Sequence, residues 1–141
     1  MEEKKFVFDL FPSTLAIGRQ HAKSPFPGWV KDSELIVLIR TPEEVCVICA
    51  ESVVPKGIPA ERGMRALKIR GPLELSMVGV MASVSKTFAD ANIPIFTIST
   101  YDTDYFLIHD KDLDKALAAL YKAGHTVVVL KEKGKFANPE Q

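Results

Sequence analysis

The chain has 141 residues, enough for one ordinary domain or two very small ones. Hydrophobic residues make up 47% of it, so it can bury a core. Lysine plus arginine and aspartate plus glutamate both total 18, which gives no electrostatic reason to expect nucleic acid or an anionic membrane as partner. Its apolar runs are strand-sized, and no signal-type segment follows the charged start of the chain. We therefore expect a cytoplasmic protein with no nucleic-acid or membrane partner.

The first sixty residues predict several short strands and little helix. β-branched and aromatic runs bounded by glycine, proline or polar residues are typical of strands. One helical turn is expected at Thr41-Pro42-Glu43-Glu44, because proline is tolerated at the first position of a helix. The segment from His21 to Trp29 holds two prolines and a glycine, so we expect an irregular loop with Trp29 packed beneath it. The expected strands are residues 6–10, 15–19, 35–40 and 45–51.

Two cysteines, Cys46 and Cys49, form a C-x-x-C pattern of the kind found in metal and redox sites. They lie in the run Val45-Cys46-Val47-Ile48-Cys49-Ala50, whose β-branched residues predict a strand. Side chains three residues apart in a strand point to opposite faces, so the two sulfur atoms are not expected to converge. The sequence has no second cysteine pair and no histidine pair at zinc spacing. We expect buried, reduced cysteines, no metal and no cofactor.

A change of composition divides the chain. One glycine and two prolines between residues 55 and 60 interrupt strand pairing and indicate a linker. We therefore predict an N-terminal lobe of residues 1–60 and a C-terminal lobe of residues 61–135. Residues 136–141 are expected to form a flexible tail.

The C-terminal lobe predicts two helices among four strands. Ser76 stands where a helix N-cap belongs, before apolar residues at helical spacing that continue to Ala91. A second helix is expected from a cap at Asp110 or Asp112 to Gly124, since aspartate favours a helix start and glycine a helix end. The resulting βαββαβ order is the split βαβ unit of the ferredoxin-like α+β fold. The expected strands are residues 65–70, 95–100, 105–108 and 126–130.

In that topology the second strand, from Ile95 to Thr100, lies at an edge of the sheet. This strand has no charged residue and no internal proline, and such an edge recruits another chain unless it is covered. We expect it to pair either with the N-terminal lobe or with a second subunit. The second alternative predicts a homodimer or a larger oligomer.

Candidate catalytic groups are few. Ser83 and Ser85 lie in an apolar helix with no histidine nearby in the sequence, and the three histidines share no motif. Asp102 and Asp104 form a pair of carboxylates in the hairpin turn, and three roles stay open for them: acid–base chemistry, metal binding and a solvated turn. The glycines match no nucleotide-binding motif. We expect that the protein is not an enzyme.

The segment from Arg62 to Val129 resembles a known family. The similarity lies in Arg65-Ala66-Leu67, Gly71-Pro72-Leu73, Ala123-Gly124-His125 and the run from Ile98 to Tyr105. These residues resemble the small stand-alone tandem ACT proteins, which are similar to the regulatory ACT domains of aspartate kinase and to the cytosolic arginine sensors called CASTOR. The resemblance implies two ferredoxin-like ACT lobes side by side with a joined sheet, and a small amino acid held where lobes meet. The first lobe is expected to be degenerate, because it lacks a convincing first helix.

An amino-acid site needs groups for a carboxylate and for an ammonium. Backbone amides at the start of a helix suit a carboxylate, since they lie at the positive end of the helix dipole. For the ammonium, the resemblance places Asp104 together with the carbonyl of Thr100 or Tyr101. A purely structural role stays open, in which Ser76 caps the helix and Asp104 braces the hairpin. The expected ligand-binding residues are Ser76, Met77, Val78, Gly79, Thr100, Tyr101, Asp102 and Asp104.

Three functional hypotheses follow from the sequence. The leading one is a non-enzymatic regulatory or sensor protein that binds an amino acid at the interface between ACT lobes. The alternative is an assembly module that holds a protein partner through its apolar edge, with no ligand. An enzyme that uses the two aspartates comes third.

Overall fold

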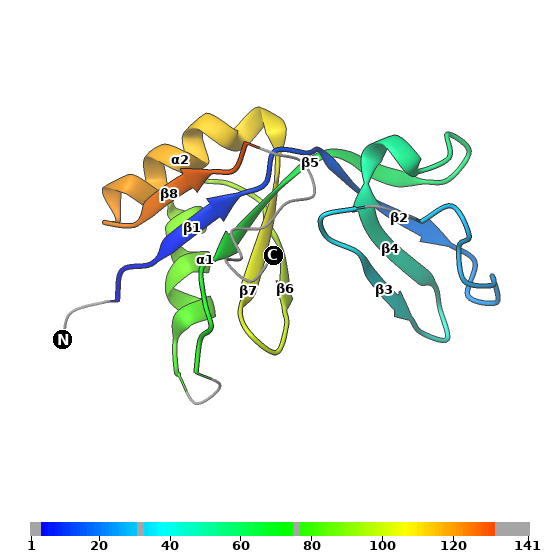
Figure 1. Cartoon of the computed structure of the whole chain (residues 1–141), viewed down its shortest axis with the longest axis horizontal. Helices are drawn as coiled ribbons and strands as arrows, with labels where there is room; N and C mark the ends of the chain where they lie inside the picture. Colours follow the sequence, from blue (N-terminus) through cyan, green and yellow to red (C-terminus); the bar gives the residue numbers. More distant parts are fainter. Residues whose placement is uncertain (1–3, 31–32, 75–76, 132–141) are drawn as a thin grey trace. The chain divides into compact units, whose positions relative to one another are not determined.

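The computed structural model describes residues 4–30, 33–74 and 77–131, and Figure 1 shows the path of the chain. Contacts between residues divide the chain into two compact units. The N-terminal unit combines residues 12–64 with the segment that begins at Lys131. The C-terminal unit combines the segment that ends at Phe11 with residues 65–130. No helix in the described ranges is long and apolar enough to span a lipid bilayer.

The N-terminal unit is an antiparallel sheet with the spatial order β3-β4-β2-β5. In chain order these are the second, third, first and fourth strands of the unit, which is the order of a ferredoxin-like sheet. The described part of this unit contains no α-helix, and its one helical segment is the 3-10 turn η1. The expectation that the first lobe lacks a proper helix is therefore confirmed. The elements are β2 (Leu15–Gln20), β3 (Val37–Arg40), β4 (Val45–Ala50), η1 (Glu51–Val53) and the first half of β5 (Ala60–Ile69).

The helical turn that was expected at residues 41–44 is wrong, because these residues form the hairpin turn between β3 and β4. The Thr41 amide donates to the Glu44 carbonyl over 2.9 Å. The Thr41 hydroxyl oxygen accepts the amides of Glu43 and Glu44, each at 3.1 Å. Strand pairing continues up to Arg40 and Val45, so the four residues between the strands must reverse the chain. The threonine side chain satisfies the turn amides in place of helical bonds.

The core of the N-terminal unit includes alternate residues of β4. Val45, Val47 and Cys49 are buried in one cluster, and Trp29 from the preceding loop packs against it, as expected. Cys46 is half-buried on the opposite face of the strand, so the two free cysteines do not converge. Burial raises the pKa of both thiols, with the charge of Glu44 adding a smaller effect at Cys46. Both cysteines therefore favour the neutral, unreactive thiol.

The C-terminal unit contains five strands in the order β8-β1-β5-β7-β6, with two α-helices. From β5 onward its elements follow the βαββαβ order predicted from the sequence, and β6 lies at an edge as expected. Helix α2 begins after an N-cap at Asp112 and ends before Gly124, which has φ +94°. The elements are β1 (Val7–Leu10), the second half of β5, α1 (Val80–Asp90), β6 (Phe96–Ser99), β7 (Asp104–His109), η2 (Asp110–Asp112), α2 (Leu113–Lys122) and β8 (Thr126–Val129).

Strand β1 belongs to the C-terminal unit, whereas the sequence pattern assigned it to the N-terminal lobe. It runs parallel to β8 and antiparallel to β5, and so separates the fourth and first strands of the ferredoxin-like unit. The physical reason is burial, because Phe8 and Leu10 lie in the core of this unit. The boundary between the units lies within β5, after Met64, since the first half of that strand pairs with β2.

Both helices of the C-terminal unit pack on the same face of its sheet. Alternate strand residues, including Leu67 and Ile69 of β5, point toward this face. Val84 and Phe88 of α1 meet them. The fully or almost fully buried cluster is Phe8, Leu10, Leu67, Ile69, Val84, Phe88, Ile93, Phe106, Ile108, Ala116, Leu120 and Val127.

We predict that Phe8→Ala lowers the free energy of unfolding of the C-terminal unit by about 3–5 kcal/mol, the usual cost of removing a buried phenylalanine ring. Phe8 is fully buried, and its ring contacts those of Phe106 and His125 at centroid distances of 6.3 and 5.4 Å. Urea unfolding followed by circular dichroism measures the loss. The matched control is Phe26→Ala, because the Phe26 side chain is 63% exposed and its removal should change stability by less than about 0.5 kcal/mol. Equal effects of the two substitutions would contradict the burial argument.

Candidate functional site

The turn between β6 and β7 is held against the segment that follows β5. The Thr103 hydroxyl donates to the Ile69 carbonyl over 2.6 Å, and this bond is buried. The Leu73 amide donates to the Asp102 carbonyl over 2.7 Å. A Cβ atom at Gly71 would lie 3.0 Å from the Asp102 carbonyl oxygen, so a larger residue there would force the two segments to shift apart slightly. These contacts fix the hairpin tip next to the segment that leads into α1.

The turn is also closed by its own hydrogen bonds. The Thr100 amide and hydroxyl both donate to the Thr103 carbonyl, at 2.8 and 3.0 Å. The Thr103 amide donates back to the Thr100 hydroxyl oxygen over 3.2 Å. The side chains of Tyr101 and Asp102 are left exposed at the tip. The turn therefore presents them on a backbone with little freedom to rearrange.

A cavity of about 200 Å³ lies between this turn and the start of α1. It is smaller than the roughly 300–1,000 Å³ typical of sites for drug-sized ligands, which suits a small molecule. Every described residue in its lining belongs to the C-terminal unit. The lining residues are Leu73, Glu74, Met77, Val80, Ser99, Thr100, Tyr101, Asp102, Thr103 and Asp104.

The structure brings together five of the eight residues that the sequence indicated for ligand binding. Met77 lines the cavity from the α1 side, and Thr100, Tyr101, Asp102 and Asp104 line it from the hairpin.

Of the other three residues, the two that the structure describes do not line this cavity. The Val78 side chain is 93% exposed and lies outside the lining. Gly79 is the N-cap of α1 and also lies outside it. Ser76, the expected helix cap, lies outside the described residues.

The expected start of the first helix is wrong, because α1 begins at Val80. Gly79 has φ +84°, a left-handed conformation that cannot continue a right-handed helix. The Met77 amide donates to the Glu74 carbonyl over 3.0 Å, so it is not open to a ligand as the sequence argument required. The amides without an intrahelical acceptor are those of the first turn, which begins with Val80 at the cavity wall.

Asp104 has a structural contact as well as a place in the cavity. Its Oδ1 atom accepts the Ser99 hydroxyl over 2.7 Å, and the two residues are cross-strand partners at the end of the hairpin. A carboxylate has two oxygens and about four acceptor positions, so this single bond leaves room for a ligand donor. Asp104 therefore braces the hairpin and still offers acceptor capacity to the cavity.

Sequence reasoning missed half of the lining residues, namely Leu73, Glu74, Val80, Ser99 and Thr103. Two signals were present. The run Gly71-Pro72-Leu73-Glu74 marks a loop after the strand, where ligand contacts are common. Hairpin pairing with a four-residue turn places Ser99 opposite Asp104.

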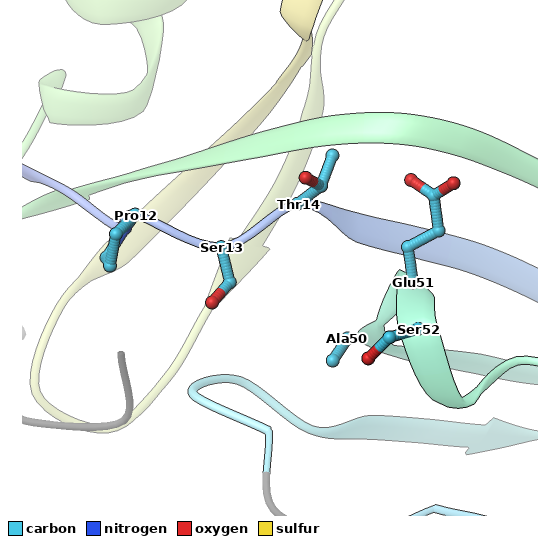
Figure 2. A pocket seen from close by; sticks show the side chains of 6 residues that line it. All are labelled: Pro12, Ser13, Thr14, Ala50, Glu51 and Ser52. Atoms are coloured by element: carbon cyan, nitrogen blue, oxygen red, sulfur yellow. The ribbon is translucent and has the colours of Figure 1, made fainter. Parts of the chain in front are cut away.

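The N-terminal unit has a cavity of its own, of about 380 Å³, lined by Pro12, Ser13, Thr14, Ala50, Glu51 and Ser52 (Figure 2). The charged side chain in this lining is that of Glu51, whose Oε1 atom accepts the Gly63 amide over 3.0 Å. Figure 2 shows the Glu51 carboxylate pointing away from Ser52. The hydroxyls of this cavity offer no counter-charge for an ionic ligand. We therefore place the candidate site in the C-terminal unit.

Metal-ligating residues do not gather in the described ranges. No group of three or more histidine, cysteine, aspartate or glutamate residues there is placed to hold a metal ion. The His125 Nδ1 atom accepts a hydrogen bond from the Phe6 amide over 3.0 Å and so holds the segment before β1 in place. The His21 Nδ1 atom accepts the Lys23 amide over 3.1 Å.

Comparison with protein families matches residues 60–122 to the ACT domain. This match begins at β5 and ends with α2, so it contains most of the C-terminal unit and the whole candidate site. A search of curated proteins found no match.

The chain is also similar to solved structures. One is a protein from Agobacterium tumefaciens, with 24% identity and a TM-score of 0.87 over 93% of this chain and 98% of that one. Aspartate kinase from Synechocystis has 19% identity and a TM-score of 0.66 over 92% of this chain, which spans only 28% of the kinase. The ligand-free regulatory subunit of aspartate kinase from Thermus thermophilus has 14% identity and a TM-score of 0.56, over 83% of this chain and 96% of that one. These similarities, together with the family match, show an α+β fold of ferredoxin-like ACT type.

We predict that Thr103→Val lowers the free energy of unfolding by about 1–3 kcal/mol, because it leaves the buried Ile69 carbonyl without its donor. Valine has nearly the shape of threonine, so the change removes the hydroxyl and little else. Thr103→Ser is the matched control, since it keeps the hydroxyl and should retain most of this contribution. Chemical denaturation of the three proteins measures the difference. A valine variant as stable as wild type would show that this bond does not hold the hairpin tip.

Proposed function

We propose that this protein is a non-enzymatic, cytoplasmic regulatory protein that binds a small amino acid in the cavity of the C-terminal unit. The proposal rests on the lining of this cavity, which contains hydrogen-bond acceptors of the hairpin on one side and the start of α1 on the other. An amino acid needs both kinds of group, one for its ammonium and one for its carboxylate. The ACT match and the similarity to a regulatory subunit of aspartate kinase support a regulatory role. As the resemblance implies, the proposal includes a further ACT lobe that closes over the ligand.

The α-ammonium of the ligand binds at the hairpin. Asp104 of the cavity lining supplies a carboxylate, and the backbone carbonyl of Thr100 or Tyr101 is a further acceptor. A hydrogen bond between two charged groups contributes about 1.5–3 kcal/mol, more than a bond between neutral partners. Asp104 is therefore the residue on which affinity should depend most.

The carboxylate of the ligand binds at the first turn of α1. The amides of this turn have no acceptor within the helix, and the helix dipole places partial positive charge there. Such an interaction contributes about 0.3–1 kcal/mol on an exposed surface and more when water is partly excluded. Val80, at the start of the turn, lines the cavity. The amides proposed to bind the carboxylate therefore lie after Gly79, not before it.

We predict that one or more amino acids raise the melting temperature of the protein and that Asp104→Asn abolishes the rise. At a ligand concentration about one hundred times Kd, binding adds roughly 2.7 kcal/mol to the stability of the folded state. Asparagine keeps an acceptor for the Ser99 hydroxyl but removes the charge that holds the ammonium. A thermal-shift screen of the twenty amino acids measures the effect.

The control for this experiment is Asp114→Asn, which removes the charge of an exposed aspartate on α2 outside the cavity lining. This variant should respond to the ligand as wild type does. If Asp104→Asn also responds normally, the assignment of Asp104 is wrong. If no amino acid changes the melting temperature of wild type at millimolar concentration, the assembly module becomes the better explanation.

We further propose that the protein forms a homodimer or a larger oligomer through the β6 edge. In the described part of the chain, β6 pairs only with β7, so its other side has free backbone groups. No residue from Ile95 to Thr100 is charged, and Phe96 is exposed. An uncharged edge of this kind is open to pairing with a second chain.

We predict that the wild-type protein is at least a dimer at micromolar concentration and that Thr97→Lys shifts it toward the monomer. Thr97 lies in the middle of β6 and is exposed, so two symmetry-related lysines would place like charges at the shared edge. Size-exclusion chromatography with light scattering measures the mass. Thr126→Lys, at an exposed position in β8, is the control and should leave the mass unchanged. A wild-type monomer would refute the prediction.

A further inference from the structure

His125 is a buried polar residue of the C-terminal unit, with an exposed fraction of 5%. It lies between α2 and β8, and its own amide donates to the Leu120 carbonyl over 3.0 Å. Its ring stacks on that of Phe6 at a centroid distance of 5.7 Å and meets the ring of Phe8 edge-on at 5.4 Å. This packing restrains the orientation of the imidazole.

The bond between this ring and the segment before β1 depends on the protonation state of the ring. The Phe6 amide donates to His125 Nδ1 over 3.0 Å. A ring nitrogen that accepts a hydrogen bond carries no proton, so the imidazole is neutral and its proton lies on Nε2. In the charged imidazole both nitrogens carry protons, and neither accepts. Protonation at Nδ1 therefore sets one N–H group against another and breaks the bond.

Two further bonds attach the segment before β1 at the same place. The Thr126 amide donates to the Phe6 carbonyl over 3.0 Å, so both backbone groups of Phe6 are bonded to residues 125–126. The Lys5 ammonium donates to the Ala123 carbonyl, just after α2, over 2.8 Å. The parallel pairing of β1 with β8 begins at the next residue of β1. Loss of the histidine bond therefore opens the ladder from its first pair.

The charged side chains in the two segments that meet here are cationic. The ring belongs to residues 119–130, which include the end of α2 and β8, and it contacts residues 4–8. Neither segment contains an aspartate or glutamate, so neither offers a carboxylate to a positive charge on the ring. Their lysines are Lys4, Lys5 and Lys122.

Lys5 also occupies the position from which α2 attracts a positive charge. The carbonyl end of a helix favours a cation, but the Lys5 ammonium already binds a carbonyl there. A Cβ atom at Gly124 would lie 2.9 Å from the Lys5 Cε atom, so this side chain lies against the residue before His125. Tyr121 is the other titratable residue of these segments, and its hydroxyl donates to a carbonyl of β8. The lysine therefore repels a positive charge on His125.

We propose that His125 is an acid-sensitive latch that holds the segment before β1 against β8. In the neutral form Nδ1 binds the Phe6 amide, and uptake of a proton at Nδ1 breaks this bond and releases residues 4–6. Phe6, which packs half-buried against the core, then leaves it, and the pairing of β1 with β8 opens from this end. This device lies outside the lining of the amino-acid cavity and does not depend on a ligand there.

The direction of the pH effect follows from the accepting nitrogen. The released state binds a proton without cost, whereas the latched state binds one at Nδ1 only by losing its hydrogen bond. Acid therefore favours release. A histidine in an unfolded chain has a pKa of about 6.5, so the latched state is fully favoured above this pH and is lost progressively below it.

Amide hydrogen exchange on the full chain, followed by NMR, tests the latch. Each rate is compared with the intrinsic rate at the same pH, because exchange is itself catalysed by base. We expect the protection of the Phe6 and Thr126 amides to fall about tenfold or more between about pH 7.5 and about pH 5.5. The Leu130 amide, which donates to the Leu10 carbonyl at the other end of the ladder, is the internal control and should keep its protection. Protection of Phe6 and Thr126 that is independent of pH would overturn the proposal.

Two histidine variants assign the response. His125→Asn keeps an acceptor near the position of Nδ1 but removes the group that titrates, so the protection of Phe6 should lose its pH dependence. The matched control is His21→Asn. His21 Nδ1 also accepts a backbone amide, that of Lys23, but His21 is exposed and belongs to the N-terminal unit. This variant should respond to pH as wild type does. A response that persists in His125→Asn would show that another group controls the segment.

The wild-type chain gives a second measurement that does not depend on the folding of a variant. Long-range proton–nitrogen NMR spectra distinguish the two neutral tautomers of an imidazole from its charged form. We expect His125 to carry its proton on Nε2 at neutral pH, and to become charged over the same pH range in which the Phe6 amide loses protection. A proton on Nδ1 at neutral pH, or a titration of the ring with no change at Phe6, would refute the latch.

Discussion

The buried hydrogen bond from the Thr103 hydroxyl to the Ile69 carbonyl is the contact on which the site depends. Ile69 is the last residue of β5, so the bond joins the end of that strand to the hairpin turn. The nearby bond from the Leu73 amide to the Asp102 carbonyl joins the same two segments, and Gly71 lets them approach. Without these contacts the carboxylates of the turn would have no fixed position relative to α1. Contacts between these two backbone segments therefore determine the geometry of the site, and the charged side chains act from the positions that the backbone gives them.

Most of the fold could be predicted from the sequence, because the strands and helices have clear apolar periodicity and their ends have strong local signals. Asp112 and Gly124 mark the ends of α2, as the sequence indicated. Two features of the structure could not be predicted from the sequence. The pairing of β1 with β8 depends on contacts between residues far apart in the sequence, which no local pattern encodes. The late start of α1 depends on the positive φ of Gly79, and glycine adopts both signs of φ. Since the helix start was misplaced, so were the amides expected to face the ligand.

The two units contain the same type of turn, but the residues that flank the turn differ in their chemical groups. In each unit a threonine begins the turn between the second and third strands of the ferredoxin-like order, and its amide donates to the carbonyl three residues later. The strand pair that flanks the turn is Ser99 and Asp104 in the C-terminal unit, but Arg40 and Val45 in the N-terminal unit. The turn geometry is thus shared, while the carboxylate of the proposed site is present in one unit. This difference predicts one ligand of this kind per chain.

The position of β1 has a consequence for how the C-terminal unit folds. This strand is synthesised well before its partner β8, because most of the described chain lies between the two strands in the sequence. The hydrogen bond between Phe6 and His125 spans 119 residues of sequence. Contacts of such long range require closure of a large loop and are typical of slow folding. During synthesis, Phe8 and Leu10 therefore remain without their native core until the chain has been extended past residue 129, and this interval is when the unit is most exposed to aggregation.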